Sequence, residues 1–194
     1  MTVKSRILFT LLLAVLFAFR PAHKQETSTD IQPVRIVKQA AFKKGEFLRY
    51  DVSYGYFDAA KATLEIKEVS AAINGRKTMH VIGKGKSSGP LSWFFKVDDR
   101  YETYIDETTI LPLKFIRHVR EGDYELDREI SFNQAAHKAT VSQNGKTNYK
   151  VAPNTQDLLS AFYYARTLDM ENVSVGQEFE IQTFFDREMY PLKF

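Results

Sequence analysis

Short runs of alternating apolar and polar residues, separated by turn sequences, restrict the fold of this chain more than any other feature. In residues 47–56, every second side chain beginning with Leu48 is apolar or aromatic. A period of two is typical of a β-strand that buries one face. Asn-Gly pairs at residues 74–75 and 144–145 readily adopt the left-handed backbone of tight hairpins. These features predict a mainly β fold built from hairpins.

The same patterns predict the remaining secondary structure. Further strands are expected at residues 60–70, 77–84, 97–105, 112–120, 123–132, 138–143, 147–151, 178–185 and 188–194. Residues 156–166 show a helical period with an apolar stripe that includes Leu158 and Phe162, and Asn154 is expected to cap this helix. The expected fold class is a curved antiparallel sheet, or a partial barrel, with one amphipathic helix packed on it.

The hairpin at residues 112–132 has the clearest register. With residues 121–122 as a two-residue turn, Arg117 faces Leu126, and the other face carries pairs of opposite charge that stabilise antiparallel strands. Arg117 and Arg128 fall on the mostly apolar face. If they are buried they need anionic partners, such as a lipid headgroup; otherwise their guanidinium groups extend to the rim of the sheet.

The first 22 residues have the pattern of a secretory signal. Lys4 and Arg6 precede an apolar run at residues 7–19, which is shorter than the roughly 20 residues that a membrane-spanning helix needs. The small residues of a cleavage site are poorly matched at Ala22, so an uncleaved amino-terminal anchor is the alternative. Because the chain has no cysteine, it is not expected to be a lipoprotein.

The rest of the chain divides into a leader and one domain. Residues 23–41 are polar and are interpreted as a flexible leader, and residues 42–194 as a single β-rich domain. The sequence ends at Phe194 in a strand-like segment without a closing element, which would leave a sheet edge unpaired. The domain is therefore expected to be incomplete at its C-terminal end.

The distribution of charge argues against one class of partner. Three of the 27 basic residues, Lys4, Arg6 and Arg20, lie in the expected signal, which leaves 24 basic residues to match the 24 acidic ones. A nucleic-acid-binding domain would carry a basic surplus, because neutralising phosphate dominates such affinity. No nucleic-acid partner is expected.

The sequence predicts no catalytic residue, metal site or cofactor. The absence of cysteine excludes thiolate metal sites and iron–sulfur clusters, and the four histidines are isolated along the chain. Asp98 and Asp99 should point to opposite faces of one strand, and Ser160 lacks the glycines of a nucleophile elbow. The alternate acidic residues of 121–129 are interpreted as a cross-paired strand face rather than a calcium site. Enzymatic activity is not expected.

Aromatic side chains provide the candidate binding site. A tyrosine-rich sheet face beneath an amphipathic helix could line an apolar groove with a few polar groups, as in many ligand sites. The candidate ligand-binding residues are Tyr54, Tyr56, Trp93, Phe94, Phe162 and Tyr163. The alternative is that these rings fill the core of the domain.

Three motifs follow one another within residues 42–190. They are Phe-x-x-Gly-Glu-x-Leu-x-Tyr from Phe42, Tyr-Glu-Thr-Tyr-Ile-Asp from Tyr101, and Asp-Leu-Leu-Ser-Ala-Phe-Tyr-Tyr-x-Arg from Asp157. In this order they resemble the bacterial exported family known as domain of unknown function 3108 (DUF3108). The resemblance implies an exported envelope protein, mostly antiparallel β, with no established activity.

The resemblance also bears on single residues. It implies that the closing strands of the family lie beyond Phe194, and that Asp157 and Arg166 are structural residues that fix the helix to the sheet. The family usually has Ala-Gly where this chain has Ala59 and Ala60, so the turn after the first strand is expected to differ.

The leading hypothesis is an exported cell-envelope protein, in the periplasm or at the outer membrane, that binds an apolar or lipid-like ligand between sheet and helix. It rests on a likeness of shape to periplasmic lipid carriers. The first alternative is a periplasmic scaffold or interaction module that pairs an exposed edge strand with another envelope protein. A hydrolase of envelope polymers is the less favoured alternative, since no convergent acid–base pair is found in the sequence.

Overall fold

The computed structural model describes residues 35–54, 57–68 and 70–194. The expected signal at residues 1–22 lies outside the described residues, as does most of the expected leader. The described part contains no helix that is long and apolar enough to cross a membrane.

The described end of the expected leader contacts the domain. Residues 35–41 form no regular secondary structure, but the N–H of Val37 donates to the carbonyl of Thr108 at 3.0 Å. The guanidinium carbon of Arg35 lies 3.4 Å from the centre of the Tyr164 ring. This part of the chain is therefore attached to the domain by hydrogen bonding and by cation–π stacking.

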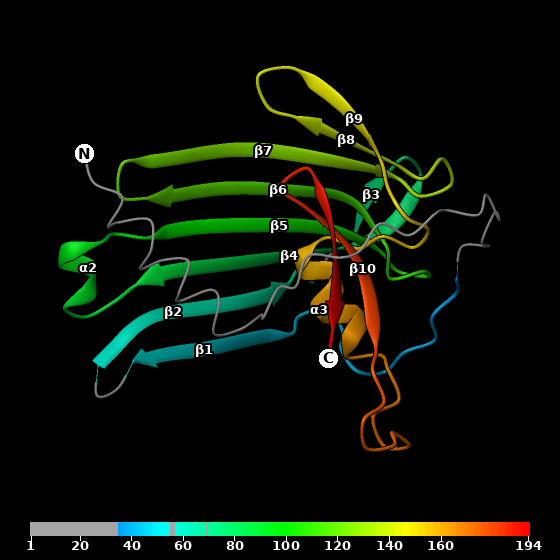
Figure 1. The fold of residues 1–194 in the computed structure, drawn as a ribbon, viewed down its shortest axis with the longest axis horizontal. Coiled ribbons are helices and arrows are strands. Elements are labelled where there is room, and N and C mark those ends of the chain that lie inside the picture. Colours follow the sequence, from blue (N-terminus) through cyan, green and yellow to red (C-terminus); the bar gives the residue numbers. More distant parts are fainter. Residues whose placement is uncertain (1–34, 55–56, 69) are drawn as a thin grey trace.

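Nine strands of the described chain form one antiparallel sheet whose two ends do not pair with each other (Figure 1). The strands lie side by side in chain order, except that the short β3 (Ala71–Ile73) pairs with β4 alone. The others are β1 (Phe47–Tyr54), β2 (Phe57–Ile66), β4 (Arg76–Ser87), β5 (Asp98–Asp106), β6 (Pro112–Glu121), β7 (Tyr124–Asn133), β8 (Lys138–Ser142) and β9 (Lys146–Lys150). This arrangement confirms the expected fold class.

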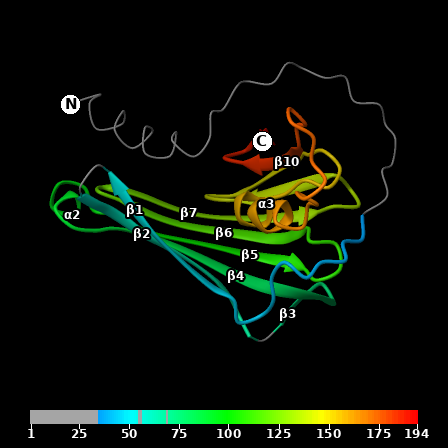
Figure 2. The same cartoon turned by 90° about the horizontal axis from the view of Figure 1, so that it is seen from below.

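The remaining long elements lie on one side of this sheet. Figure 2 shows that the sheet is curved and that α3 (Leu158–Ala165) and the hairpin of β10 (Glu180–Phe185) and β11 (Glu188–Lys193) lie on its concave side. They cover one half of the sheet. The short helix α2 (Leu91–Phe94) lies at the opposite end (Figures 1 and 2).

The register aligns a buried row of side chains across the concave face. From β2 to β8 this row consists of Ile66, Val81, Thr103, Phe115, Ile130 and Val141. Leu159 and Tyr163 of α3 and Phe184 of β10 belong to the same apolar core. Because apolar burial dominates the stability of a domain, this row fixes where the second layer sits.

The β6–β7 hairpin has a different register from the one expected. Arg117 faces Arg128 rather than Leu126, and the turn residues are Gly122 and Asp123. Gly122 has a φ of 58°, and a two-residue hairpin of type II′ favours glycine at its first central position. The turn therefore lies one residue later than expected. The pairing shifts by two residues, which leaves every side chain on its expected face.

The start of α3 also differs from the expectation. Its N-cap is Asp157 rather than Asn154, which has a φ of 56°. One oxygen of the Asp157 carboxylate accepts the backbone N–H groups of Leu159 at 2.8 Å and Ser160 at 2.9 Å. The other accepts the hydroxyl of Thr103 on β5 at 2.5 Å. Asp157 therefore caps the helix, because its carboxylate accepts backbone N–H groups of the first turn that have no partner within the helix.

The β5–β6 connection holds Ile110 at a φ of 53°, which is rare for a β-branched residue. The Asp106 carboxylate accepts the N–H of Thr109 at 2.9 Å and the Nε of Arg76 at 2.6 Å. The carbonyl of Ile110 accepts from Nε2 of Gln156 at 2.9 Å, just before α3. These bonds offset the backbone strain and join the connection to the helix.

Candidate functional site

The four candidate aromatic residues whose side chains are described fall into two separate pairs. Tyr163 is fully buried in the core beneath α3, and Phe162 beside it is 37% exposed, with the two ring centres 5.3 Å apart. Trp93 and Phe94 lie on α2, at the other end of the sheet (Figure 1). The structure therefore does not bring the two pairs together.

The other two candidates are on or beside β1. Tyr54 is the last residue of that strand, where its backbone pairs with Phe57, but its side chain lies outside the described atoms. Tyr56 lies outside the described residues altogether. Their roles stay predictions.

The contact between α3 and the sheet is closely packed. A Cβ atom added to Gly83 on β4 would lie 3.2 Å from side-chain carbons of both Leu159 and Leu64. Tyr163 fills the core beside this contact and packs edge-on against Phe42, with 4.9 Å between ring centres. A ligand between α3 and the sheet would have to displace these side chains.

Beyond the edge of α3, small residues form an open part of the concave face. Gly85 points to the same face as Gly83, and no heavy atom lies within 4 Å of the position of a Cβ there. Its neighbour across β2 is Ala62, whose neighbour on β1 is Tyr50. We call Tyr50, Val52, Ala60, Ala62 and Gly85 the small-residue patch. Tyr50 and Val52 are 43% and 37% exposed, so the patch offers apolar surface to solvent.

A buried cluster of charges lies on the same face toward β7. Arg117 and Arg128 face each other across β6 and β7, and both donate to Asp186 in the β10–β11 turn, Arg128 at 2.5 Å. The guanidinium carbon of Arg117 also lies 4.2 Å from the centre of the Phe185 ring. The two arginines are therefore buried against a carboxylate of this chain and do not extend to the rim.

Two carboxyl groups meet between this cluster and α2. Asp99 is buried on β5, where it accepts the N–H of Arg120 at 2.9 Å, and it is hydrogen-bonded to Glu121. Burial, together with the charge of Asp99, raises the pKa of Glu121 to about 7. Burial also raises the pKa of Asp99. The pair therefore holds a proton at a pH where an exposed glutamate has lost it.

Asp157 attaches the start of α3 to β5, and Arg166 attaches its end to the segment that precedes β1. Asp157 is bound to Thr103 on β5, and burial raises its pKa to about 6. The guanidinium group of Arg166 binds both carboxylate oxygens of Glu46, at 2.6 and 2.8 Å, and the carbonyl of Ala41 at 2.8 Å. Each residue fixes the helix, but through its own partners and not through a bond between the two.

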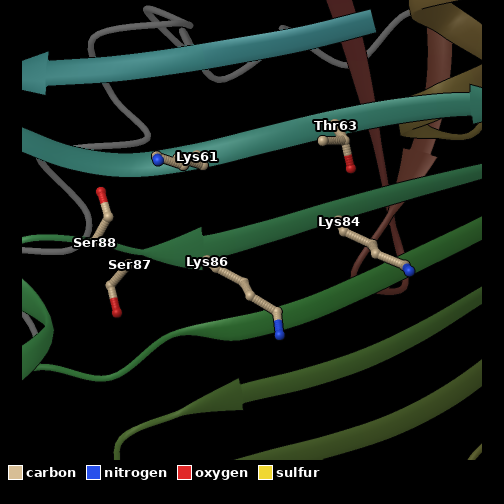
Figure 3. A pocket seen from close by; sticks show the side chains of 6 residues that line it. All are labelled: Lys61, Thr63, Lys84, Lys86, Ser87 and Ser88. Atoms are coloured by element: carbon tan, nitrogen blue, oxygen red, sulfur yellow. The ribbon is translucent and has the colours of Figure 1, made fainter. Parts of the chain in front are cut away.

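The convex face carries a basic groove of about 390 Å³ near α2. Its lining residues are Lys61, Thr63, Lys84, Lys86, Ser87 and Ser88 (Figure 3). Lys86 is paired with Asp98 at 3.0 Å, whereas Lys61 and Lys84 make no ion pair within the described part of the chain. The groove therefore has a positive potential that suits an anionic group.

Residues able to bind a metal do not cluster in the described ranges. No group of three or more histidine or acidic side chains there has the geometry of a metal site. The Asp99–Glu121 pair supplies two carboxyl groups, but a hydrogen bond between them already uses one proton and one acceptor.

Sequence reasoning missed the Asp99–Glu121 pair and Asp186. A signal for the pair exists, because Asp99 shares its strand face with Tyr101, and Glu121 shares its face with Arg117. The sequence alone did not show that β5 and β6 are neighbours in one sheet and direct these side chains to the same side of it. Asp186 could not be found in this way, since it comes from the second sheet.

Comparison with known proteins identifies the family. Residues 49–194 match the family described as "Protein of unknown function (DUF3108)". The match spans well over half of the chain, and the protein therefore belongs to this family. No curated protein and no solved structure matches the chain. The fold and the sites described above therefore carry the functional argument.

Proposed function

We propose that this protein is an exported cell-envelope protein that binds an amphipathic, lipid-like ligand on the concave face beside α3. The observation that supports a ligand is the small-residue patch, where Gly85 leaves open space above the sheet and Tyr50 and Val52 expose apolar surface. Apolar surface on a curved face, next to a few charged groups, is the usual composition of a site for such a ligand.

The charges beside the patch suggest how the ligand is oriented. Gly85 pairs across the sheet with Asp99, and Gly83 with Tyr101, which in turn pairs with Arg117. Arg117 is buried, yet its Nε atom has no hydrogen-bond acceptor among the described residues. An anionic headgroup over Tyr101 would supply that acceptor, while the apolar part of the ligand lies on the patch.

The proposed site differs in position from the first expectation. Leu159 and Tyr163 occupy the contact between α3 and the sheet, so the ligand is placed beside the helix and not beneath it. Phe162, which is partly exposed on α3 next to the buried Tyr163, is the candidate aromatic residue of this helix that a ligand can reach. The proposal is a binding role without catalysis.

The test compares two leucine substitutions on different strands of the sheet. Gly85→Leu fills the space above the patch, and Lys150→Leu adds the same side chain to β9, at an exposed position away from the patch and the basic groove. We expect native mass spectrometry of gently isolated protein to show an adduct of lipid mass. Gly85→Leu should reduce that adduct at least about tenfold, because the leucine occupies the volume of the ligand, while Lys150→Leu retains it.

Two results would count against the ligand. One is a bare mass for the wild-type chain under conditions that preserve its fold. The other is equal adduct in both variants, which would place any bound lipid elsewhere. Circular dichroism of each variant checks that the sheet is intact before the masses are compared.

Export is supported by the charged start and apolar run of residues 1–22. Cell fractionation with and without these residues tests it. We expect the full chain in the envelope fraction and the shortened chain in the cytoplasm. Recovery of both in the cytoplasm would contradict export.

The two alternative functions, a scaffold and a hydrolase, can each be tested by a specific experiment. In the scaffold alternative, β1 and β9 end the sheet path, and each has one paired neighbour in the described chain. A proline in either strand should then release a bound envelope protein.

In the hydrolase alternative, Asp99 and Glu121 are the convergent carboxyl groups, and Asp99→Asn should abolish hydrolysis. Because Asp99 is buried and bonded to Arg120, we favour a structural role for it.

A further inference from the structure

The two most exposed aromatic side chains of the described chain lie next to each other. Trp93 is 91% exposed and Phe94 is 86% exposed, and both belong to α2 at the end of the sheet that α3 leaves free (Figure 2). Two adjacent exposed rings are unfavourable in water and commonly mark an interaction site.

The segment that carries these rings is held in place by hydrogen bonds. Before α2, the N–H of Ser88 donates to the carbonyl of Ala59 at 2.9 Å, and within α2 the hydroxyl of Ser92 donates to the carbonyl of Gly89 at 2.7 Å. After α2, the carbonyl of Lys96 accepts the N–H of Gly122 at 2.8 Å. The segment that carries the two rings is therefore anchored to the sheet by hydrogen bonds on both sides of α2.

The basic groove adjoins this turn. Ser87 and Ser88 line the groove and lead directly toward α2, so the groove and the rings share one segment (Figure 3). Acidic residues neutralise part of the groove, since Asp98 pairs with Lys86 and Asp51 faces Lys61 across the strands. Lys84 faces Arg100 on β5, but Arg100 is paired with Glu102 at 2.7 Å and Lys84 lies near Glu65, so these acidic residues offset part of the positive charge. A surface with net positive charge therefore lies beside the exposed apolar tip, which consists of Trp93 and Phe94.

We propose that Trp93 and Phe94 dock this end of the molecule on a bilayer that contains anionic lipid, with Lys61 and Lys84 next to the headgroups. Tryptophan prefers the boundary between headgroups and acyl chains, and lysines near a membrane surface are attracted to anionic lipid. Two side chains on one turn are too small an area for a stable protein interface, which buries about 800 Å² on each partner. A bilayer needs only shallow insertion of such a tip.

This inference goes beyond the proposed ligand and does not depend on it. The docking surface is the tip and the convex groove, whereas the ligand is placed on the concave patch. A variant of Gly85 therefore tests the ligand alone, and a variant of Phe94 tests the docking alone.

The chain contains its own probe for this test, because Trp93 is its single tryptophan. The apolar residues 1–22 could attach the full chain to a vesicle, so the measurement has to be local to the tip. We expect Trp93 emission to shift to shorter wavelength with phosphatidylglycerol-containing vesicles, and to be quenched by lipids brominated on the acyl chain. Phosphatidylcholine vesicles should give a smaller shift, as should high salt.

Two variants and one control complete the experiment. Phe94→Ser keeps the probe and should lower the ratio of inserted to exposed Trp93 about tenfold. Lys61→Glu combined with Lys84→Glu should remove the preference for anionic vesicles. Val175→Ser changes a fully exposed apolar residue on another loop and should have no effect.

The proposal is overturned if Trp93 emission and its quenching stay unchanged with anionic vesicles while the chain is folded. A blue-shifted emission without vesicles that depends on protein concentration would also overturn it, because the tip would then be covered by a second copy of the chain. An equal response in Phe94→Ser and the wild type would exclude insertion of the tip.

Discussion

At the scale of single residues, two carboxyl groups on the concave side titrate at unusual pH. The pKa of Asp157 is raised from 3.8 to about 6 and that of Glu121 from 4.5 to about 7, mainly because burial disfavours the carboxylate. Between the ordinary and the raised values, the folded chain binds more protons than the unfolded chain. The free energy of unfolding therefore falls as the pH rises through this window and levels off above it.

We therefore expect stability to decrease as the pH is raised from about 5 to about 7, measured by urea denaturation. Asp157→Asn should remove the part of this decrease that occurs below about pH 6. Glu121→Gln should remove the part that extends to about pH 7. Asp169→Asn, in which an exposed carboxyl group is changed, should retain both parts. A wild-type stability that rises steadily across this range would contradict the assignment.

At the scale of elements, two glycines of β4 separate the covered part of the sheet from the open part. A Cβ at Gly83 meets Leu159 of α3 and Leu64 of β2, whereas a Cβ at Gly85 meets no atom within 4 Å. The edge of the second layer therefore falls between two positions of one strand that point to the same side.

This boundary predicts opposite effects of one substitution. Gly83→Val should lower the free energy of unfolding by about 1–3 kcal/mol, because the added carbons overpack the contact with α3. Gly85→Val should leave it unchanged or raise it by up to about 1 kcal/mol, since valine suits a strand better than glycine. Urea denaturation of both variants measures the difference. Equal losses would show that α3 does not end at this boundary.

At the scale of the whole molecule, an open, curved sheet is half covered by a second layer. That layer is held at the Arg166–Glu46 ion pair beside β1 and at Asp186, which binds Arg117 and Arg128 near β7. The opposite half carries both the small-residue patch and the exposed tip of α2. One end of the molecule is thus specialised for stability, and we propose binding roles for the other.

Removing the Asp186 carboxylate should loosen the second layer. In Asp186→Ala, the buried guanidinium group of Arg117 loses its acceptor, while Arg128 keeps its bond to Gln143, and we expect a loss of about 1–2 kcal/mol in the free energy of unfolding. Glu188→Ala, two residues further on, removes an exposed carboxylate that accepts the hydroxyl of Tyr190 at 3.0 Å and should cost less than about 0.5 kcal/mol. Equal effects of the two variants would mean that the arginine cluster does not hold the layers together.

Local patterns were sufficient to predict the long strands, the single long helix and the fold class, but not the short elements β3 and α2. The Asn74-Gly75 turn has positive φ angles at both residues, as its sequence predicts, because this preference belongs to the backbone of those two residues. Strand ends and the β6–β7 register were less accurate. A change of one residue in a turn alters every pairing that follows, and sequence alternation alone does not distinguish registers that differ by two.

In the candidate site, too, local sequence predicted some features and not others. The sequence by itself determined the β-rich fold, the family and the apolar stripe of α3, because these depend on neighbouring residues, whereas the exposure of Trp93 and Phe94 is known only from the structure. Only the tertiary structure decided that Asp99 meets Glu121, that Asp186 neutralises Arg117 and Arg128, and that α3 stops between Gly83 and Gly85. The first contact depends on the pairing of two neighbouring strands, whereas the other two join elements far apart in the chain, and the packing of two layers sets which of those meet.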